Sequence, residues 1–90
     1  VPGNFTLLQN YPNPFNPYTT IEFAVPEQSY ISLRVYNILG QEVATLMDRT
    51  LTDEEQYSLD FDATNLSSGV YFYRLQTSDF VQTKKMVLMK

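Results

Sequence analysis

The sequence predicts an all-β fold, a seven-stranded antiparallel β-sandwich, and three observations support this class. Apolar and polar residues alternate in several stretches, as in Ile21, Phe23 and Val25, which is the period of a half-buried strand. The apolar residues are mostly β-branched or aromatic, the types that suit a pleated surface. Turn-forming residues separate the stretches at short intervals, which is the spacing of an antiparallel sandwich.

The turns between these stretches define the strands in order. Residues 26–29 separate the second strand from the third, and residues 62–68 form a longer polar crossing loop before the sixth. Gly40 suits the left-handed position of a short hairpin between the third and fourth strands. The predicted strands span residues 5–9, 19–25, 30–37, 41–48, 56–61, 69–77 and 80–89. The pattern predicts an immunoglobulin-like sandwich, with a closed barrel as the alternative.

Two strands depart from simple alternation. Val43, Leu46 and Met47 do not alternate strictly, which predicts a β-bulge in the fourth strand. In the last strand Lys84 shares a face with Met86 and Leu88 unless a bulge intervenes. Lysines there are typical of an edge strand, where they deter pairing between sheets.

The alternating positions predict which side chains fill the core. Most aromatic side chains fall on the inward phase of the strands, and we expect them in the core. Three fall on the outward phase and could form a contact patch. The expected core residues are Phe23, Leu33, Val35, Leu59, Phe61, Tyr71 and Tyr73, and the expected outward aromatics are Tyr30, Tyr36 and Phe72.

Composition narrows the function classes. The 90 residues are enough for one domain, so we treat residues 1–90 as a single unit. Cysteine and histidine are absent, which removes the commonest metal ligands and nucleophile–base pairs, so we expect no enzyme and no cofactor. A net charge of −4 argues against nucleic acid, and the short apolar runs predict no transmembrane segment. Residues 1–4 do not read as a signal peptide, so we expect any export signal to lie upstream.

Two groups of acidic residues raise the alternative of a metal-binding or acid–base site. Asp60 and Asp62 could share a strand face, and residues 53–55 form an acidic run. Paired carboxylates can bind calcium or act as acid and base. A solvated face and an exposed loop explain them more simply, because the spaced oxygen ligands of a calcium loop are missing.

The segment between the first two strands is the least generic part of the chain. Prolines fix their own φ and restrict the preceding residue, so the segment is predicted to be stiff. We interpret it as a rigid corner onto which Tyr11 and Phe15 pack, or as a preformed docking loop. Its residues are Pro12, Asn13, Pro14, Phe15, Asn16 and Pro17.

Several motifs, in order, resemble the type A C-terminal sorting domains of the type IX secretion system. The first opens the chain and the last ends it, so the resemblance covers nearly all of the sequence. One departure is residues 53–56 (DEEQ), where many members of that family have a pair such as Ala-Gly. The motifs are residues 8–17 (LQNYPNPFNP), 19–23 (TTIEF) with Pro26, 35–43 (VYNILGQEV), 66–75 (LSSGVYFYRL) and 83–90 (TKKMVLMK).

The resemblance implies an export address. Such immunoglobulin-like domains direct a fused N-terminal cargo domain through the periplasm and across the outer membrane, where the cargo is anchored at the cell surface or secreted. The implied partners are the type IX translocon, outer-membrane shuttle proteins and a sortase-like surface peptidase. The implied recognition residues are Gly69, Tyr71, Arg74, Lys84, Lys85, Met86, Leu88 and Lys90.

The sequence also leaves one alternative function class open and supports two expectations for the sorting class. The alternative class is a structural immunoglobulin-like linker or a carbohydrate-binding module that uses Tyr36 or Phe72. For the sorting class, we expect a basic tail of Lys84, Lys85 and Lys90 that steers toward an acidic receptor. We also expect that deleting the last few residues impairs export more than folding, because strand ends fray.

Overall fold

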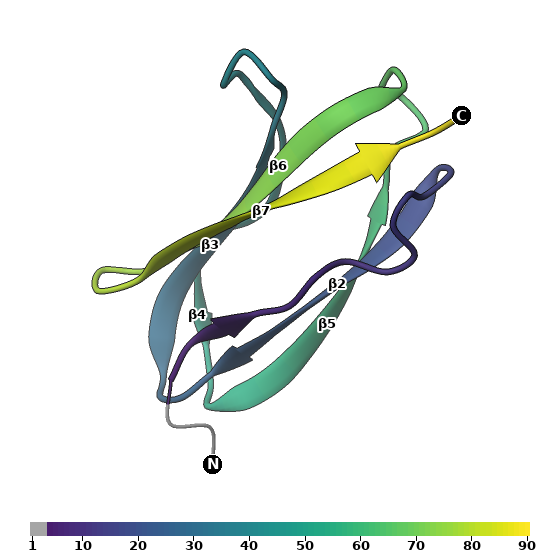
Figure 1. Ribbon diagram of the computed structural model, residues 1–90. Coiled ribbons are helices and arrows are strands. Elements are labelled where there is room, and N and C mark those ends of the chain that lie inside the picture. The colour runs from purple at the N-terminus through teal and green to yellow at the C-terminus, as the bar shows by residue number, and fades with distance from the viewer. Residues whose placement is uncertain (1–3) are drawn as a thin grey trace.

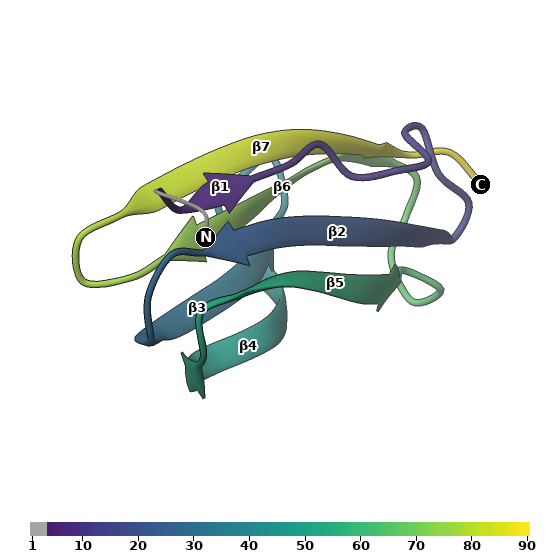
Figure 2. The same ribbon diagram turned by 90° about the horizontal axis from the view of Figure 1, so that it is seen from below.

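The computed structural model describes residues 4–90, and the elements of this part of the chain are strands. They form two sheets, one with the order β1-β2-β5 and one with the order β4-β3-β6-β7, in which all neighbours are antiparallel. The sheets lie face to face (Figures 1 and 2). This confirms the seven-stranded antiparallel sandwich, and the two separate sheets exclude the closed barrel. The strands are β1 (Thr6–Leu7), β2 (Tyr18–Val25), β3 (Ser29–Tyr36), β4 (Glu42–Thr52), β5 (Glu55–Asp62), β6 (Gly69–Gln76) and β7 (Val81–Leu88).

The core lies between the two sheets and uses the alternating positions of the strands. In β2, for example, Ile21, Phe23 and Val25 are fully buried while the residues between them are not. Six of the seven predicted core residues are buried. Leu59 is the exception: it lies on the edge strand β5 and is only partly buried against the core, whereas Phe61 of the same strand is buried.

The fourth strand was predicted too short. β4 runs to Thr52 rather than to residue 48, because pairing with β3 resumes beyond an irregular stretch, with Ile31 opposite Thr50. Arg49 has a φ of 48°, and Asp48 and Arg49 have no partner across the strand pair. Further register shifts leave Val43 and Leu46 without partners, which confirms the bulge predicted from the broken alternation there.

The last strand needs no bulge. β7 pairs with β6 without a register shift over its whole length, from Val81 to Leu88. Lys84 therefore shares the inner face with Met86 and Leu88, and it is half-buried where they are fully buried. An inward-pointing charge near a sheet edge discourages pairing with another chain.

Several connections meet at one end of the sandwich. β2 begins where β5 ends, and β6 begins where both β3 and β7 end. The loops between these strands therefore gather at the end that carries the C-terminal residues (Figure 1). We term this the proline end, and it comprises residues 10–17, 37–41, 62–69 and 85–90.

Candidate recognition surface

The proline-rich segment connects the two sheets. Tyr11 bonds through its backbone to Thr20 of β2, at 3.0 and 2.8 Å. Four residues later Phe15 forms a parallel bridge with Leu88: its N–H donates to the Val87 carbonyl, and its carbonyl accepts from the Met89 N–H, both at 2.9 Å. The segment is therefore more than the predicted corner between two strands, because it also covers the end of the β7 edge (Figure 2).

Phe15 anchors this segment and Tyr11 does not. The Phe15 ring is buried, and its centre lies 6.4 Å from that of Phe61. Beside it the Asn13 Oδ1 accepts a 2.9 Å hydrogen bond from the Val87 N–H. The Tyr11 side chain is 51% exposed, so the prediction that both aromatic rings pack onto the sandwich was half wrong.

A buried polar cluster fixes the start of the segment. The Asn10 side chain is buried, and its Nδ2 donates to Thr19 Oγ1 at 2.9 Å and to the Pro12 carbonyl at 3.2 Å. The Tyr73 hydroxyl accepts from the Asn10 N–H at 2.8 Å and donates to the Leu8 carbonyl at 2.7 Å. Burial raises the pKa of the Tyr73 hydroxyl, and the hydrogen bond from the Asn10 N–H partly offsets this increase. Sequence reasoning missed Asn10 and Thr19, since polar residues beside prolines are typical of exposed turns.

Most of the remaining segment faces solvent. Pro12, Asn13, Pro14 and Asn16 are exposed, and Pro17 is half-buried. The X-Pro bonds of the three prolines are cis. The backbone is thus tied down at Asn10 and Phe15, while the side chains between and after them remain available to a partner.

The C-terminal residues are tied to the β5–β6 loop. The Lys90 N–H donates to Ser68 Oγ at 2.9 Å, and Lys90 Nζ donates to the Thr64 carbonyl at 2.5 Å. The Asp62 carboxylate accepts from the Thr64 hydroxyl and from the Thr64 N–H. These two bonds hold the pKa of Asp62 below its usual value, and the charge of Lys90 adds to the effect.

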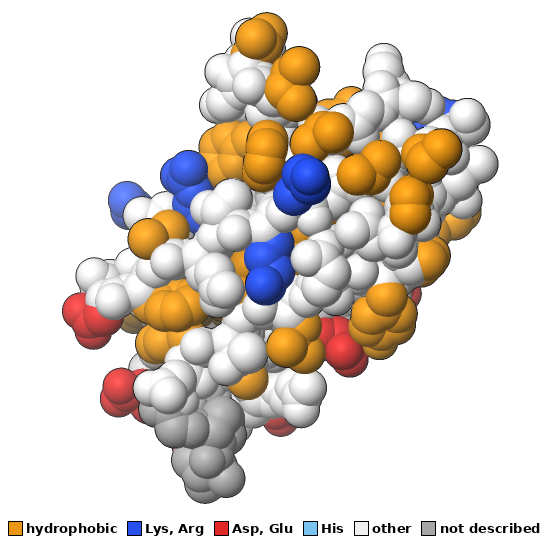
Figure 3. Space-filling view, in the orientation of Figure 1, with side chains coloured by type: hydrophobic (Ala, Val, Ile, Leu, Met, Phe, Trp, Pro, Cys, Tyr) orange, Lys and Arg blue, Asp and Glu red, His pale blue; other side chains and the backbone are white. Residues whose placement is uncertain are grey.

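Basic side chains lie over β6 and β7. Figure 3 shows this face, with lysine and arginine side chains above the two strands and hydrophobic ones toward the proline end. Lys85 is exposed, and Arg74 lies 4.8 Å from the centre of the Tyr36 ring. Within residues 4–90 both ion pairs involve Arg34, so the lysines of β7 have no carboxylate partner there.

Three predicted recognition residues lie in the core instead. Tyr71, Met86 and Leu88 are buried on the inner faces of β6 and β7, so their side chains do not reach a partner from this fold. Gly69 has a φ of 153°, a conformation that favours glycine, with open space where a Cβ would lie. Met86 and Leu88 are both buried close to the end of β7, so deletion of the last residues would also remove core side chains.

The outward aromatic residues form no flat sugar platform. Tyr36 and Phe72 are cross-strand neighbours on the outer face, and both are half-buried, with Arg74 against the Tyr36 ring. Only Tyr30 of the three is largely exposed. The structure therefore gives little support to carbohydrate binding through Tyr36 and Phe72.

The acidic residues are engaged in local bonds. Asp60 accepts from the Thr20 hydroxyl at 2.9 Å, and Asp53 accepts from Gln28 at 3.1 Å. Among residues 4–90, no group of three or more carboxylates is arranged to hold a metal ion. The same part of the chain contains no helix long and apolar enough to cross a membrane.

Comparison with known families identifies the chain. A family model described as "Secretion system C-terminal sorting domain" matches residues 9–89, which include the proline-rich segment, the central hairpin and β7. A search of curated proteins and a search of solved structures each returned no significant match. Domains of this family are signals of type IX secretion, interact with its machinery and direct secretion across the outer membrane to the cell surface or the extracellular space. The chain, an all-β sandwich over its described residues, belongs to this family of non-catalytic sorting domains.

Proposed function

We propose that the type IX machinery recognises this domain at the proline end. The observation that carries the proposal is the junction between the proline-rich segment and β7. Asn13 and Phe15 bond to Val87 and Met89, and the Gln9 side chain donates to the Lys85 carbonyl at 2.8 Å. Two segments 74 positions apart thereby make one continuous, rigid surface.

Basic residues give this surface its electrostatic character. Lys85 and Lys90 are exposed beside the junction, and Lys84 and Arg74 are half-buried nearby on β7 and β6. In a domain with a net charge of −4, such a patch favours an acidic region of a receptor and speeds encounter with it. In this proposal the receptor contacts two groups of side chains: Pro12, Asn13, Pro14, Asn16, Pro17, Lys85 and Lys90 at the proline end, and Arg74 and the half-buried Lys84 next to it.

The buried members of the predicted set act indirectly. Tyr71, Met86 and Leu88 pack under the surface, and Gly69 pairs with Leu88 at the start of β6. Their role in this proposal is to hold the end of β7 against the proline-rich segment. Changing them would disturb recognition through the fold.

We also propose which proteins act on the domain before and after it is recognised. Residues 1–90 act as one sorting unit for a fused N-terminal cargo domain. The receptors are the translocon and an outer-membrane shuttle protein, and a sortase-like surface peptidase later separates cargo from the sorting unit. The sole support for these partners is membership of the family.

A fusion experiment tests the proposal. Residues 1–90 are joined to a periplasmic reporter in a host with the type IX system, and delivery to the cell surface or medium is measured. We expect the wild-type fusion to be delivered and Lys85→Glu to lower delivery at unchanged melting temperature. Arg49→Glu is the matched control, because it makes the same charge change on β4, outside the proline end.

Two results would contradict the proposal. A wild-type fusion that remains in the periplasm would show that residues 1–90 are not a sufficient address. Equal delivery of Lys85→Glu and Arg49→Glu would show that the basic residue at the proline end is not read. The melting temperature of each variant is measured as well, so that a loss of delivery through unfolding is distinguished from a loss of recognition.

A further inference from the structure

The hairpin between β3 and β4 exposes the two most accessible large hydrophobic side chains of residues 4–90. Ile38 is 71% exposed and Leu39 is 77% exposed. The hairpin projects from the proline end in Figure 1, and Figure 3 shows hydrophobic side chains at the tip of this projection. Neither residue is among the side chains that the proposed function assigns to receptor contact.

The hairpin is held rigid by its own bonds. The Asn37 N–H donates to the Gln41 carbonyl, and the Gly40 N–H donates to the Asn37 carbonyl, both at 3.0 Å. The Asn37 Oδ1 accepts from the Leu39 N–H at 2.9 Å and the Gln41 N–H at 3.0 Å, and Asn37 Nδ2 donates to Gln41 Oε1 at 2.8 Å. Gly40 has a φ of 80°, which side-chain-bearing residues rarely adopt. The Asn37 side chain therefore fixes the turn from within.

The exposed apolar residues of this hairpin are not needed to reverse the chain. A two-residue Asn-Gly or Asp-Gly turn reverses a chain without exposing apolar side chains. Here the backbone is fixed so that Ile38 and Leu39 point into solvent and are not packed onto the sandwich. A rigid apolar projection loses little conformational freedom when it binds, which favours affinity.

We propose that Ile38 and Leu39 form an aliphatic anchor that inserts into an apolar pocket on a protein of the export machinery. This inference rests on the proposed function, and it adds a second contact to the basic and proline-rich one. The hairpin lies at the same end of the sandwich as the proline-rich segment and the C-terminal residues, so one receptor can contact both. The anchor supplies burial of apolar area, while the lysines supply steering.

The charges around the hairpin favour a protein over a lipid surface. Residues 37–41 carry no charge, and Glu42, which follows them, is paired with Arg34 at 3.4 Å. Binding to an anionic membrane is strengthened by unpaired lysine or arginine among the apolar residues, and residues 37–41 contain neither.

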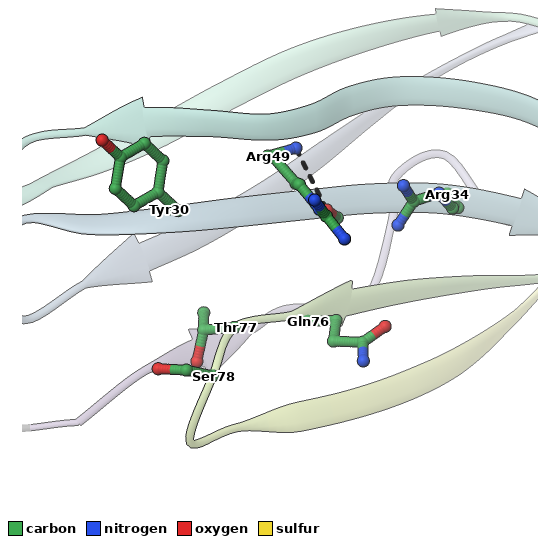
Figure 4. A pocket seen from close by; sticks show the side chains of 7 residues that line it. Tyr30, Arg34, Arg49, Gln76, Thr77 and Ser78 are labelled. Atoms are coloured by element: carbon green, nitrogen blue, oxygen red, sulfur yellow. Dashed lines mark hydrogen bonds between the residues drawn. The ribbon is translucent and has the colours of Figure 1, made fainter.

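A second copy of the chain would have to offer an apolar pocket. One cleft, of about 600 Å³, lies at the opposite half of the outer sheet face. Residues of β3, β4, β6 and the β6–β7 turn line it, including Arg34, Arg49 and Gln76 (Figure 4). Two arginine side chains make this cleft a poor site for two aliphatic side chains.

The test replaces both anchor residues in the fusion of residues 1–90. We expect Ile38→Ser/Leu39→Ser to lower delivery by about tenfold or more, the loss typical of removing an interface anchor. The melting temperature should stay within about 2 °C of wild type, because neither side chain is packed. The control is Tyr30→Ser/Leu51→Ser, which removes an exposed cross-strand apolar pair at the other end of the sandwich. A photo-crosslinking residue at position 39 should join the fusion to a component of the type IX machinery.

Each alternative result overturns the inference in a recognisable way. If the Ile38→Ser/Leu39→Ser fusion is delivered as well as the wild-type fusion, the anchor is rejected and the proposed function is unaffected. If the wild-type fusion itself is not delivered, the proposed function is rejected. Binding of the wild-type domain, but not the variant, to vesicles of anionic phospholipid would assign the hairpin to a membrane. Dimerisation of the wild-type domain that the variant loses in sedimentation would assign it to a second copy.

Discussion

At the scale of single residues, Tyr73 shows how one side chain positions the start of the proline-rich segment. Its ring is in the core, and its hydroxyl bonds to both Leu8 and Asn10, on the segment that leads from β1 to the prolines. A buried backbone N–H or carbonyl that loses its partner costs free energy. The proposed recognition surface therefore depends on a core residue that is not itself part of that surface.

Tyr73→Phe tests this dependence. We expect the unfolding free energy to fall by about 2 kcal/mol, because the Leu8 carbonyl and the Asn10 N–H lose their partner. For a domain of this size that corresponds to a melting temperature lower by roughly 10 °C, measurable by calorimetry. Tyr18→Phe, at an exposed tyrosine, is the control and should leave the melting temperature unchanged. Equal melting of both variants would show that the hydroxyl bonds contribute nothing.

Asp62 provides a second test, by acid titration. Its pKa is lowered by the two Thr64 bonds, so its stabilising effect is present above the pKa of the unfolded chain. The effect is lost as the pH falls through the lower pKa of the folded state. We expect Thr64→Val to raise the pKa of Asp62, as followed by NMR of its carboxyl carbon. An unchanged titration midpoint would show that the threonine hydroxyl does not stabilise the carboxylate.

At the scale of secondary-structure elements, β7 combines core packing with edge protection. Met86 and Leu88 are buried in its second half, where Phe15 also covers the strand edge. Removing such side chains typically costs 2–5 kcal/mol each, roughly the stability of a small domain. Deletion of the last residues is therefore expected to unfold the domain, and loss of export in such a deletion would not identify a recognition residue.

The middle of β7 offers a test of edge protection. Lys84 points inward and Lys85 outward, and neither has a carboxylate partner in the described chain. We expect Lys84→Val/Lys85→Val to associate at concentrations where wild type is monomeric, because an apolar edge strand pairs with other chains. Size-exclusion chromatography with light scattering measures this. Lys90→Val, outside the strand, should not associate, and a monomeric double variant would contradict the edge role.

At the scale of the whole molecule, the proline-rich segment closes one side of the sandwich. It leaves the first sheet at Tyr11 and reaches the second at Phe15, so both sheets are held by one short segment. The hairpin anchor and the basic residues lie at or near the same end. The arrangement can present three different kinds of contact to one receptor.

Hydrogen exchange tests whether this closure is stable. We expect Asn13→Ala to accelerate exchange of the Val87 amide by about tenfold or more, because the Asn13 carboxamide is its hydrogen-bond partner. The Tyr73 amide, in the middle of β6, is the internal control and should keep its protection. Unchanged exchange at Val87 would show that the segment adds no protection to the β7 edge.

Local patterns of the sequence were sufficient for most of the fold. The alternation of Ile21, Phe23 and Val25, the glycine at position 40 and the polar crossing loop each predicted a feature that the structure contains. Such features depend on neighbours within a few positions. The order of motifs likewise predicted the family, whose model matches residues 9–89.

The sequence by itself determined the fold class, the strand order along the chain, the bulge in β4 and the sorting family. Only the tertiary structure decided that Asn10 is buried, that Phe15 bridges to Leu88, and that three motif residues are core residues. The physical reason is the distance along the chain over which each interaction acts. Strand periodicity and turn geometry arise between adjacent residues, whereas burial at a sheet edge depends on which distant segment covers it, here one 74 positions away.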